Sequence, residues 1–317
     1  MKALSALAQS VRASTTMAID TQFKKMRAEG IDVIGFSVGE PDFPTPEHIK
    51  QAGIRAIEND QTKYTPTPGT LALRQAVRKR LQEDWGLDYT TEEIVVSGGG
   101  KPILYVALKT LLNPGDEVIL PAPYWVSYYE LIKMAGGVPV VVETTEASGF
   151  NLTPQQLRQA ITPKTKAIVI TYPSNPLGAV LDRADGEALA KVIEKHNIMV
   201  ISDEVYEKII FDGREHFSLA QIESIKDKVL VVNSLSKTYA MTGWRLGYVV
   251  GWDKDLMKHM FKMQQAVASC LPIFTMQAGA DAINGPQDCV EDMRRQYERR
   301  RDLLYNGLKE IPGMKPF

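Results

Sequence analysis

Lys237 is the residue whose chemistry stands out in this sequence of 317 residues. It follows an apolar run at residues 229–232 and is preceded by Ser234 and Ser236, with Arg245 eight positions further on. A desolvated lysine beside another positive charge loses its proton readily, and the neutral amine can then attack an aldehyde. Hydroxyl and guanidinium groups bind phosphate well. The stretch therefore predicts that Lys237 attaches covalently to a phosphate-bearing aldehyde, although a surface lysine in isolation would look the same.

A glycine-rich turn follows another apolar run, at residues 94–97. Three glycines, at residues 98–100, leave the backbone free of side chains just before a predicted helix, and Lys101 comes next. Backbone N–H groups at a helix start bind phosphate, so we interpret this turn as a second phosphate contact, with an ordinary strand-to-helix turn as the equal alternative. A P-loop is excluded, because its lysine precedes serine or threonine, whereas Lys101 precedes proline.

Two further apolar runs, at residues 167–171 and 199–202, also end in polar residues. The first leads to Asn175 in a proline-containing turn, and the second leads to Asp203 and Tyr206. An acid at the end of a buried strand can pair with a cationic ring nitrogen, although each feature alone also fits turn chemistry or a helix N-cap. The carboxyl ends of parallel strands share one edge of a sheet. Phosphate ligands, a lysine and an acid would meet there, and together they fit pyridoxal 5′-phosphate.

The elements that must position these residues alternate along the chain from residue 93. Apolar runs predict seven strands, at residues 94–97, 117–120, 138–142, 167–171, 199–202, 229–232 and 246–250. Helical patterns lie between them, at residues 102–112, 128–135, 153–161, 187–196 and 256–268. Such alternation is typical of a parallel sheet with helices on both faces. We therefore predict an α/β fold with a large, doubly wound, mostly parallel seven-stranded sheet domain and a smaller α/β domain.

The two ends of the chain are less regular. Before the sheet, the pattern predicts a helix within residues 5–30, a strand at 31–38, proline-rich loops at 39–46 and 64–69, and helices at 46–59 and 71–85. A long arginine-rich helix at residues 287–310 fits a solvated helix face better than a phosphate site. We expect residues 1–45 to form an arm and part of the small domain, residues 46–285 the large cofactor-binding domain, and residues 286–317 a linker helix and the start of a small domain that is incomplete at its C-terminal end.

Composition excludes several classes of partner. Lys and Arg number 37 against 38 Asp and Glu, so no broad basic field favours nucleic acid or an anionic membrane. No run approaches the roughly 18 apolar residues of a membrane span. Cys270 and Cys289 lack metal-binding spacing and fit a reducing compartment, so we expect a cytoplasmic protein without a metal site. The partners should be small molecules or another protein chain.

Seven motifs carry a resemblance to a known family. They are residues 38–43 (VGEPDF), 63–69 (KYTPTPG), 123–128 (PYWVSY), 174–178 (SNPLG), 203–206 (DEVY), 234–238 (SLSKT) and 243–247 (GWRLG). In this order and spacing, the chain resembles the class I/II aminotransferases of fold type I, and most closely their bacterial aspartate/aromatic subgroup. The resemblance covers essentially the whole chain. It implies a pyridoxal-phosphate enzyme that moves an amino group from an L-amino acid, with aspartate favoured, to a 2-oxo acid such as 2-oxoglutarate.

The resemblance also implies roles for individual residues. Lys237 would form the Schiff base with the cofactor and move a proton, Asp203 would pair with the pyridinium nitrogen, and Tyr206 would act with Asn175 on the ring hydroxyl. The phosphate would be held by the backbone of Gly99, Gly100 and Lys101 together with Ser234, Ser236 and Arg245. Trp125 would stack on the ring, and Gly39 would touch the substrate carboxylate, so that Gly39, Trp125 and Asn175 face the substrate. Tyr64 would reach the phosphate of the second subunit in a homodimer.

Two departures from the family pattern bear on activity. Residue 177 is leucine where the Asn-Pro-x-Gly motif usually has threonine. The C-terminal segment that carries the family's arginine for the substrate α-carboxylate has no counterpart here, so no residue is assigned to that role. Aromatic or prephenate aminotransfer, a pyridoxal-phosphate β-lyase and a cofactor-binding remnant without turnover stay as alternatives. A serine hydrolase built on residues 234–237 (SLSK) would need Ser-Asp-Asn and Lys-Thr-Gly companions, which the sequence lacks.

Overall fold

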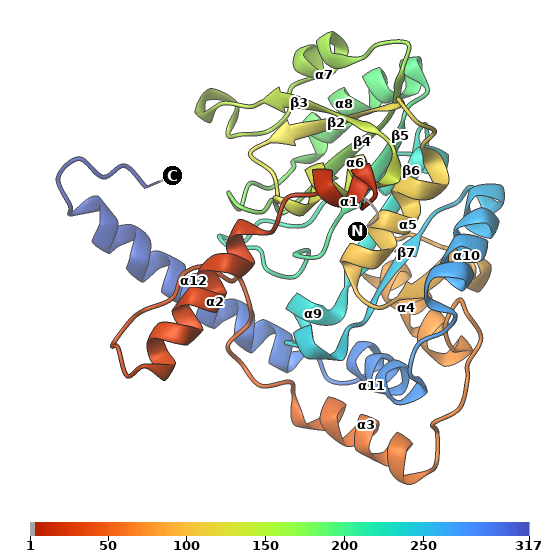
Figure 1. The fold of residues 1–317 in the computed structure, drawn as a ribbon, viewed down its shortest axis with the longest axis vertical. Coiled ribbons are helices and arrows are strands. Elements are labelled where there is room, and N and C mark those ends of the chain that lie inside the picture. Colours follow the sequence, from red (N-terminus) through yellow and green to blue (C-terminus); the bar gives the residue numbers. More distant parts are fainter. Residues whose placement is uncertain (1–3, 317) are drawn as a thin grey trace.

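The computed structural model describes residues 4–316 and is organised around one seven-stranded sheet (Figure 1). The strand order is β1-β7-β6-β5-β4-β2-β3. The strands are β1 (Ile94–Ser97), β2 (Glu117–Ala122), β3 (Val138–Glu143), β4 (Thr165–Thr171), β5 (Met199–Asp203), β6 (Val229–Ser234) and β7 (Gly247–Val250). The five strands from β3 to β6 in this order run parallel, and β7 is antiparallel to both of its neighbours. The predicted fold, a mostly parallel seven-stranded sheet, is confirmed.

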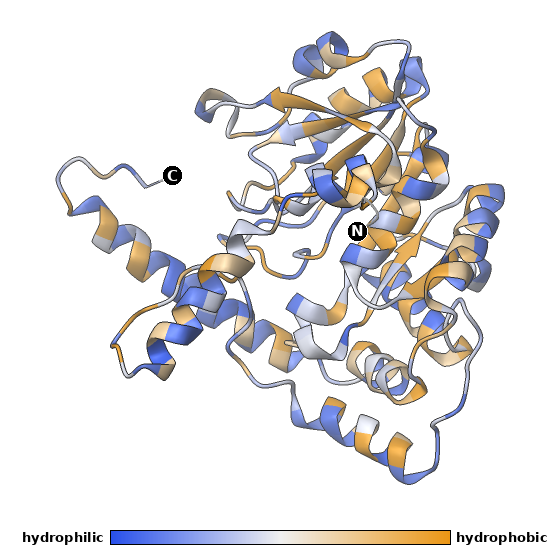
Figure 2. Ribbon diagram, viewed as in Figure 1, coloured by the Kyte–Doolittle hydropathy of each residue, from blue (hydrophilic) through white to orange (hydrophobic). Residues whose placement is uncertain are grey.

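Helices cover both faces of the sheet because successive strand residues point to opposite sides. In β1, Ile94 and Val96 belong to one apolar cluster and Val95 to the other. The first cluster is completed by α4 (Leu71–Trp85), α8 (Arg183–His196) and α11 (Ile273–Asn284), and the second by α5 (Gly100–Leu111), α6 (Ser127–Ala135) and α10 (Lys254–Ala268). Figure 2 shows the strands as the most continuously hydrophobic part of the chain. The sheet edge that carries the candidate residues is thereby held between two packed layers.

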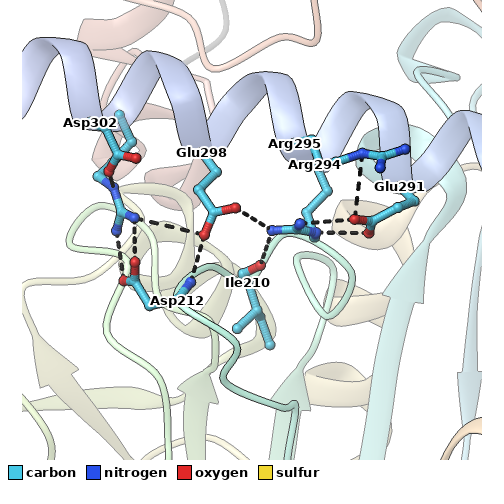
Figure 3. A network of polar contacts seen from close by, with 8 residues as sticks. Ile210, Asp212, Glu291, Arg294, Arg295, Glu298 and Asp302 are labelled. Carbon is cyan, nitrogen blue, oxygen red and sulfur yellow. Dashed lines mark hydrogen bonds and ion pairs between the residues drawn. The ribbon is translucent and has the colours of Figure 1, made fainter.

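The remaining helices lie around this core. They are α1 (Ala6–Ser10), α2 (Thr15–Ala28), α3 (Glu47–Glu58), α7 (Pro154–Ala160), the single turn α9 (Leu235–Thr238) and the long α12 (Asp288–Lys309). Figure 1 shows α12 extending away from the sheet. An ion pair and a hydrogen bond attach α12 to the segment after β5: Arg301 pairs with Asp212 at 2.6 Å, and Arg294 donates to the carbonyl of Ile210 at 3.3 Å (Figure 3). Arg294, Arg295, Arg300 and Arg301 of this helix form ion pairs with acidic side chains, in line with the expected solvated face.

Three sequence-based expectations need correction. Residues 31–38 form no strand, because no strand in the described part of the chain pairs with them, and Ile34 and Phe36 are exposed. The helix expected within residues 5–30 is two helices, and the second begins where Ser14 accepts a hydrogen bond from the Met17 N–H. Helix α11 was not predicted. The proposed domain boundaries stay a prediction. None of the helices within residues 4–316 has the length and apolar character to cross a membrane.

Candidate active site

The candidate residues meet where the central strands end. In the register of the sheet, Thr171 of β4 lies beside Asp203 of β5, and Asp203 lies beside Val232 of β6. Two residues beyond Val232, Ser234 ends β6 and caps the short helix α9 that carries Lys237. The predicted meeting of these strand ends is therefore present in the structure.

Lys237 is held against the loop that follows residue 38. Its Nζ donates a hydrogen bond to the carbonyl oxygen of Gly39. Burial lowers the pKa of Lys237, the nearby Glu40 raises it, and the charge of Arg245 lowers it further, with a net lowering. A lysine in this setting gives up its proton more easily than an exposed one, which is the state that can act as a nucleophile or a base.

A compact polar cradle lies beside this lysine. Ser234 Oγ is 2.8 Å from Ser236 Oγ and 2.9 Å from the carbonyl oxygen of Leu246, and it accepts from the Ser236 N–H at 3.2 Å. Arg245 takes a left-handed backbone conformation, with φ of 54°, and donates to the carbonyl of Thr242 at 2.9 Å. Two hydroxyls and a guanidinium group are thus gathered next to one another.

Glycines allow the start of α5 to join this cradle. Gly99 has a φ of 104°, and a Cβ there would lie 2.5 Å from a guanidinium nitrogen of Arg245. A Cβ on Gly247 would lie 2.9 Å from the Gly100 nitrogen. The helix start, its free N–H groups and Arg245 can approach only because these side chains are missing. This donor set fits a phosphate dianion.

Asp203 is a buried carboxylate at the other side of the site. Tyr128 donates a hydrogen bond to its Oδ2 at 2.7 Å, and the Val205 N–H donates to its Oδ1 at 3.3 Å. Burial raises the pKa of Asp203 to about 6, while these two hydrogen bonds lower it. No basic side chain of residues 4–316 forms an ion pair with it. A buried carboxylate of this kind fits a cationic ring nitrogen, as pyridoxal phosphate would supply.

Three aromatic and amide side chains surround the space between these ends. Asn175 donates to the hydroxyl of Tyr206 at 3.3 Å. Burial and the charge of Asp203 raise the pKa of Tyr206, which the bond from Asn175 lowers in part. Trp125 meets Tyr128 edge to face, with ring centroids 5.3 Å apart, and the Lys101 Nζ lies 4.7 Å from a ring centroid of Trp125. Together they offer an apolar surface and two hydrogen-bonding groups.

Two predicted residues behave differently from the rest. Gly39 is brought into the site through its carbonyl group, which contacts Lys237. Tyr64 is not brought in: its side chain is 94% exposed on the loop before α4. Its role in a second subunit stays a prediction. Leu177 lines a small cavity with Asn175 and the strand end at Thr171.

Sequence reasoning missed Tyr128 and Thr171 as members of the site. The Tyr128 hydroxyl lies between Asp203 Oδ2 and the Thr171 Oγ1, 2.5 Å away. Thr171 was visible as the last residue of a predicted strand, which is the position that faces a ligand. Tyr128 was assigned to a helix, and nothing in its spacing indicated that it reaches across to β5.

Comparisons with known proteins agree with this geometry. The family model described as aminotransferase class I and II matches residues 31–317. An aspartate aminotransferase of Bacillus sp. (strain YM-2) is 46% identical over 303 residues, which cover 95% of this chain and 77% of that protein. An aspartate/prephenate aminotransferase of Thermus thermophilus is 40% identical, covering 99% and 81%. The crystal structure of the Rhizobium meliloti aspartate aminotransferase superposes with a TM-score of 0.95 at 41% identity, covering 99% of this chain and 78% of that one.

Proposed function

Because the chain belongs to the aminotransferase class I and II family, it is a pyridoxal-phosphate-dependent aminotransferase, and we propose that its amino donor is aspartate. Several relatives between 41% and 46% identical carry the name aspartate aminotransferase, which supports this choice. The acceptor would be a 2-oxo acid such as 2-oxoglutarate. Prephenate is the second candidate acceptor, since two relatives at 43% and 40% identity are named aspartate/prephenate aminotransferases.

The cofactor would be held at three points. The backbone of Gly99, Gly100 and Lys101, with Ser234, Ser236 and Arg245, would bind its phosphate; Asp203 would pair with the ring nitrogen; and Asn175 and Tyr206 would bond to the ring hydroxyl, with Trp125 against the ring. When bound, the cofactor supplies the carbonyl carbon that takes the amino group and a ring that accepts electrons from the substrate Cα. The single observation that carries this placement is that the buried Asp203, at the same sheet edge as Lys237, forms no ion pair with a basic side chain of the described residues 4–316.

The chain's own residues would then divide the work. Lys237, with its lowered pKa, would take a proton from the substrate Cα at Nζ and deliver it to the carbon that was the cofactor's carbonyl carbon. Asp203 would keep a proton on the ring nitrogen, since a buried carboxylate is stabilised by a cation next to it. Gly39 lies against Lys237 and would face the substrate carboxylate. The apolar surface of Trp125 would exclude water from this proton transfer.

We further propose a homodimer in which Tyr64 completes the phosphate site of the second subunit. The support is its exposure: a tyrosine that is 94% exposed contributes nothing to the core of its own subunit, yet its loop directly precedes α4 at the rim of the large domain. We also propose that residues 46–285 form the large domain and that the flanking residues belong to a smaller one.

Borohydride trapping tests the cofactor site. The protein is loaded with pyridoxal phosphate, reduced and digested, and the labelled peptide is identified by mass spectrometry. We expect the label on Lys237 and its loss in Lys237→Ala. Lys109→Ala, which changes an exposed lysine on α5 that donates to the Ala135 carbonyl, should keep the label. A label on another lysine, or none, contradicts the placement.

A donor panel tests the substrate. Aspartate and aromatic amino acids are each supplied with 2-oxoglutarate, prephenate is tested as an alternative acceptor, and the products are quantified. We expect oxaloacetate from aspartate to form fastest. A faster reaction with an aromatic donor, or pyruvate and ammonia appearing without any acceptor, would replace aspartate aminotransfer with one of the alternative activities.

A further inference from the structure

A buried amide lies directly behind Ser234, one of the proposed phosphate ligands. Asn233 precedes Ser234 on β6 and is only 2% exposed. Because side chains alternate along a strand, Asn233 points to the face of the sheet away from the Ser234 side chain. Its Oδ1 accepts a hydrogen bond from the Ser234 N–H at 2.6 Å, and its Nδ2 donates to Oε2 of Glu207. The Asn233 amide thus connects the backbone of Ser234 to Glu207, an acid on the segment after β5.

Glu207 is committed to this contact. It is 9% exposed, and no basic side chain among residues 4–316 lies within ion-pair distance of it. The groove of about 570 Å³ that it lines also contains basic side chains, but these already have acidic partners: Lys208 pairs with Asp84 at 2.7 Å, and Arg294 with Glu298 at 2.9 Å. A carboxylate this buried needs a hydrogen-bond donor, and the Asn233 amide is the one that the structure provides.

We propose that Asn233 and Glu207 form a positioning pair that fixes Ser234 for the cofactor phosphate. An amide that is bonded at both its oxygen and its nitrogen cannot rotate, so the Ser234 peptide is held in one orientation. That orientation places Ser234 Oγ against Ser236 and the Leu246 carbonyl, which completes the hydroxyl part of the cradle. The inference rests on the proposed phosphate site and adds two residues that do not touch the cofactor.

The test compares two ligands that differ only in the phosphate. Dissociation constants for pyridoxal 5′-phosphate and for pyridoxal are measured by absorbance titration in the wild type, Asn233→Leu, Glu207→Leu and Glu207→Gln. Loss of one hydrogen bond corresponds to a factor of up to about ten. We expect both leucine variants to bind pyridoxal phosphate about tenfold more weakly and pyridoxal within about twofold of the wild type.

Glu207→Gln is the conservative variant, because its amide oxygen still accepts from Asn233. We expect its affinity for pyridoxal phosphate to stay within about threefold of the wild type. The matched control is Gln264→Leu, which removes another buried amide, on α10, whose Nε2 donates to the Val96 carbonyl at 3.5 Å. It should change neither affinity. If Asn233→Leu fails to fold, the comparison of Glu207→Leu with Glu207→Gln decides the matter alone.

Two results would overturn the proposal. Equal weakening for pyridoxal phosphate and pyridoxal would show a general structural effect, and unchanged affinity for both would show that the pair does not act on the turn. Arg245→Gln and Ser236→Ala separate this failure from that of the phosphate site itself. If these two variants selectively weaken the binding of pyridoxal phosphate while Asn233→Leu does not, the phosphate site stands and the positioning pair is refuted. If Arg245→Gln, Ser236→Ala and Asn233→Leu all leave this binding unchanged, the phosphate site and the positioning pair are both refuted.

Discussion

Replacing Asp203 with asparagine should stabilise the protein in the absence of cofactor. Burial raises the pKa of Asp203 from 3.8 to about 6, and the hydrogen bonds from Tyr128 and Val205 offset this only in part. A carboxyl group whose pKa is higher in the folded state binds its proton more tightly there. The stabilisation that comes from this bound proton is therefore complete below about pH 3.8 and is lost as the pH rises through about 6.

The size of the effect follows from the shift. A rise of about two pKa units corresponds to about 3 kcal/mol of lost stability at pH 7.5, and to roughly half of that at pH 5, where the folded protein still holds much of the proton. Asparagine matches the shape of aspartate without a charge. It can accept from the Val205 N–H and donate to the Tyr128 hydroxyl, which then donates to Thr171. The second N–H of the asparagine amide has no partner in this arrangement, so about 3 kcal/mol is the upper value of the gain.

Urea unfolding of cofactor-free protein at both pH values is the measurement. We expect Asp203→Asn to raise the free energy of unfolding by up to about 3 kcal/mol at pH 7.5 and by about 1.5 kcal/mol less at pH 5. In the same variant, affinity for pyridoxal phosphate should fall, because the ring nitrogen loses its carboxylate. Asp88→Asn, which removes an exposed ion pair with Arg78, is the control and should change stability by less than about 1 kcal/mol. A gain of the same size at both pH values, or a loss, would refute the electrostatic reasoning.

Two further predictions concern the backbone of the cradle and a buried ion pair. Gly99→Ala should destabilise the protein by about 1–3 kcal/mol, because its φ is 104°, and should weaken pyridoxal phosphate binding by displacing Arg245. Gly307→Ala on α12, whose Cβ would meet no atom within 4 Å, is the control and should neither destabilise the protein nor weaken binding in melting and titration experiments. His216→Ala should cost about 3 kcal/mol, since it removes the ring that lies 2.8 Å from the buried Glu204. Burial lowers the pKa of His216, but the nearby acids Glu204 and Glu207 leave it raised overall. The wild type should therefore lose stability relative to this variant as the pH rises through that raised pKa, as measured by urea unfolding between pH 6 and 9.

The sheet and its ligand-facing edge could be predicted because both depend on short-range patterns. A buried parallel strand is a continuous apolar run, and the polar residue that ends it lies at the ligand edge. Ser234 and Asp203 were identified in this way. The same rule misled at residues 31–38, where an apolar run has no strand beside it and Phe36 is 87% exposed. A run of apolar residues indicates a strand only where the fold supplies a partner for its backbone.

What the sequence did not reveal depends on contacts between distant segments. Helix α11 is rich in small residues, and its Gly279 packs so closely on Leu246 that a Cβ would lie 2.2 Å from that side chain. Such a helix carries little hydrophobic periodicity, so its burial cannot be recognised from its own pattern. Tyr128 contacts Asp203 at the end of β5, and Asn233 contacts Glu207 on the segment after β5. Both contacts join residues that are far apart in the sequence, so the local pattern around each residue does not reveal them.

The two ends of the site share an electrostatic property that links cofactor binding to stability. Without a ligand, Asp203 is a buried carboxylate that has no basic partner in the described part of the chain, and Lys237 lies close to the positive charge of Arg245. Each arrangement is unfavourable for the folded protein, and each is relieved by one part of the cofactor: a cation beside Asp203, and a dianion beside Arg245. Asp203 therefore destabilises the cofactor-free protein for the same reason that it binds the cofactor, and a variant that folds better at this position should bind it less well.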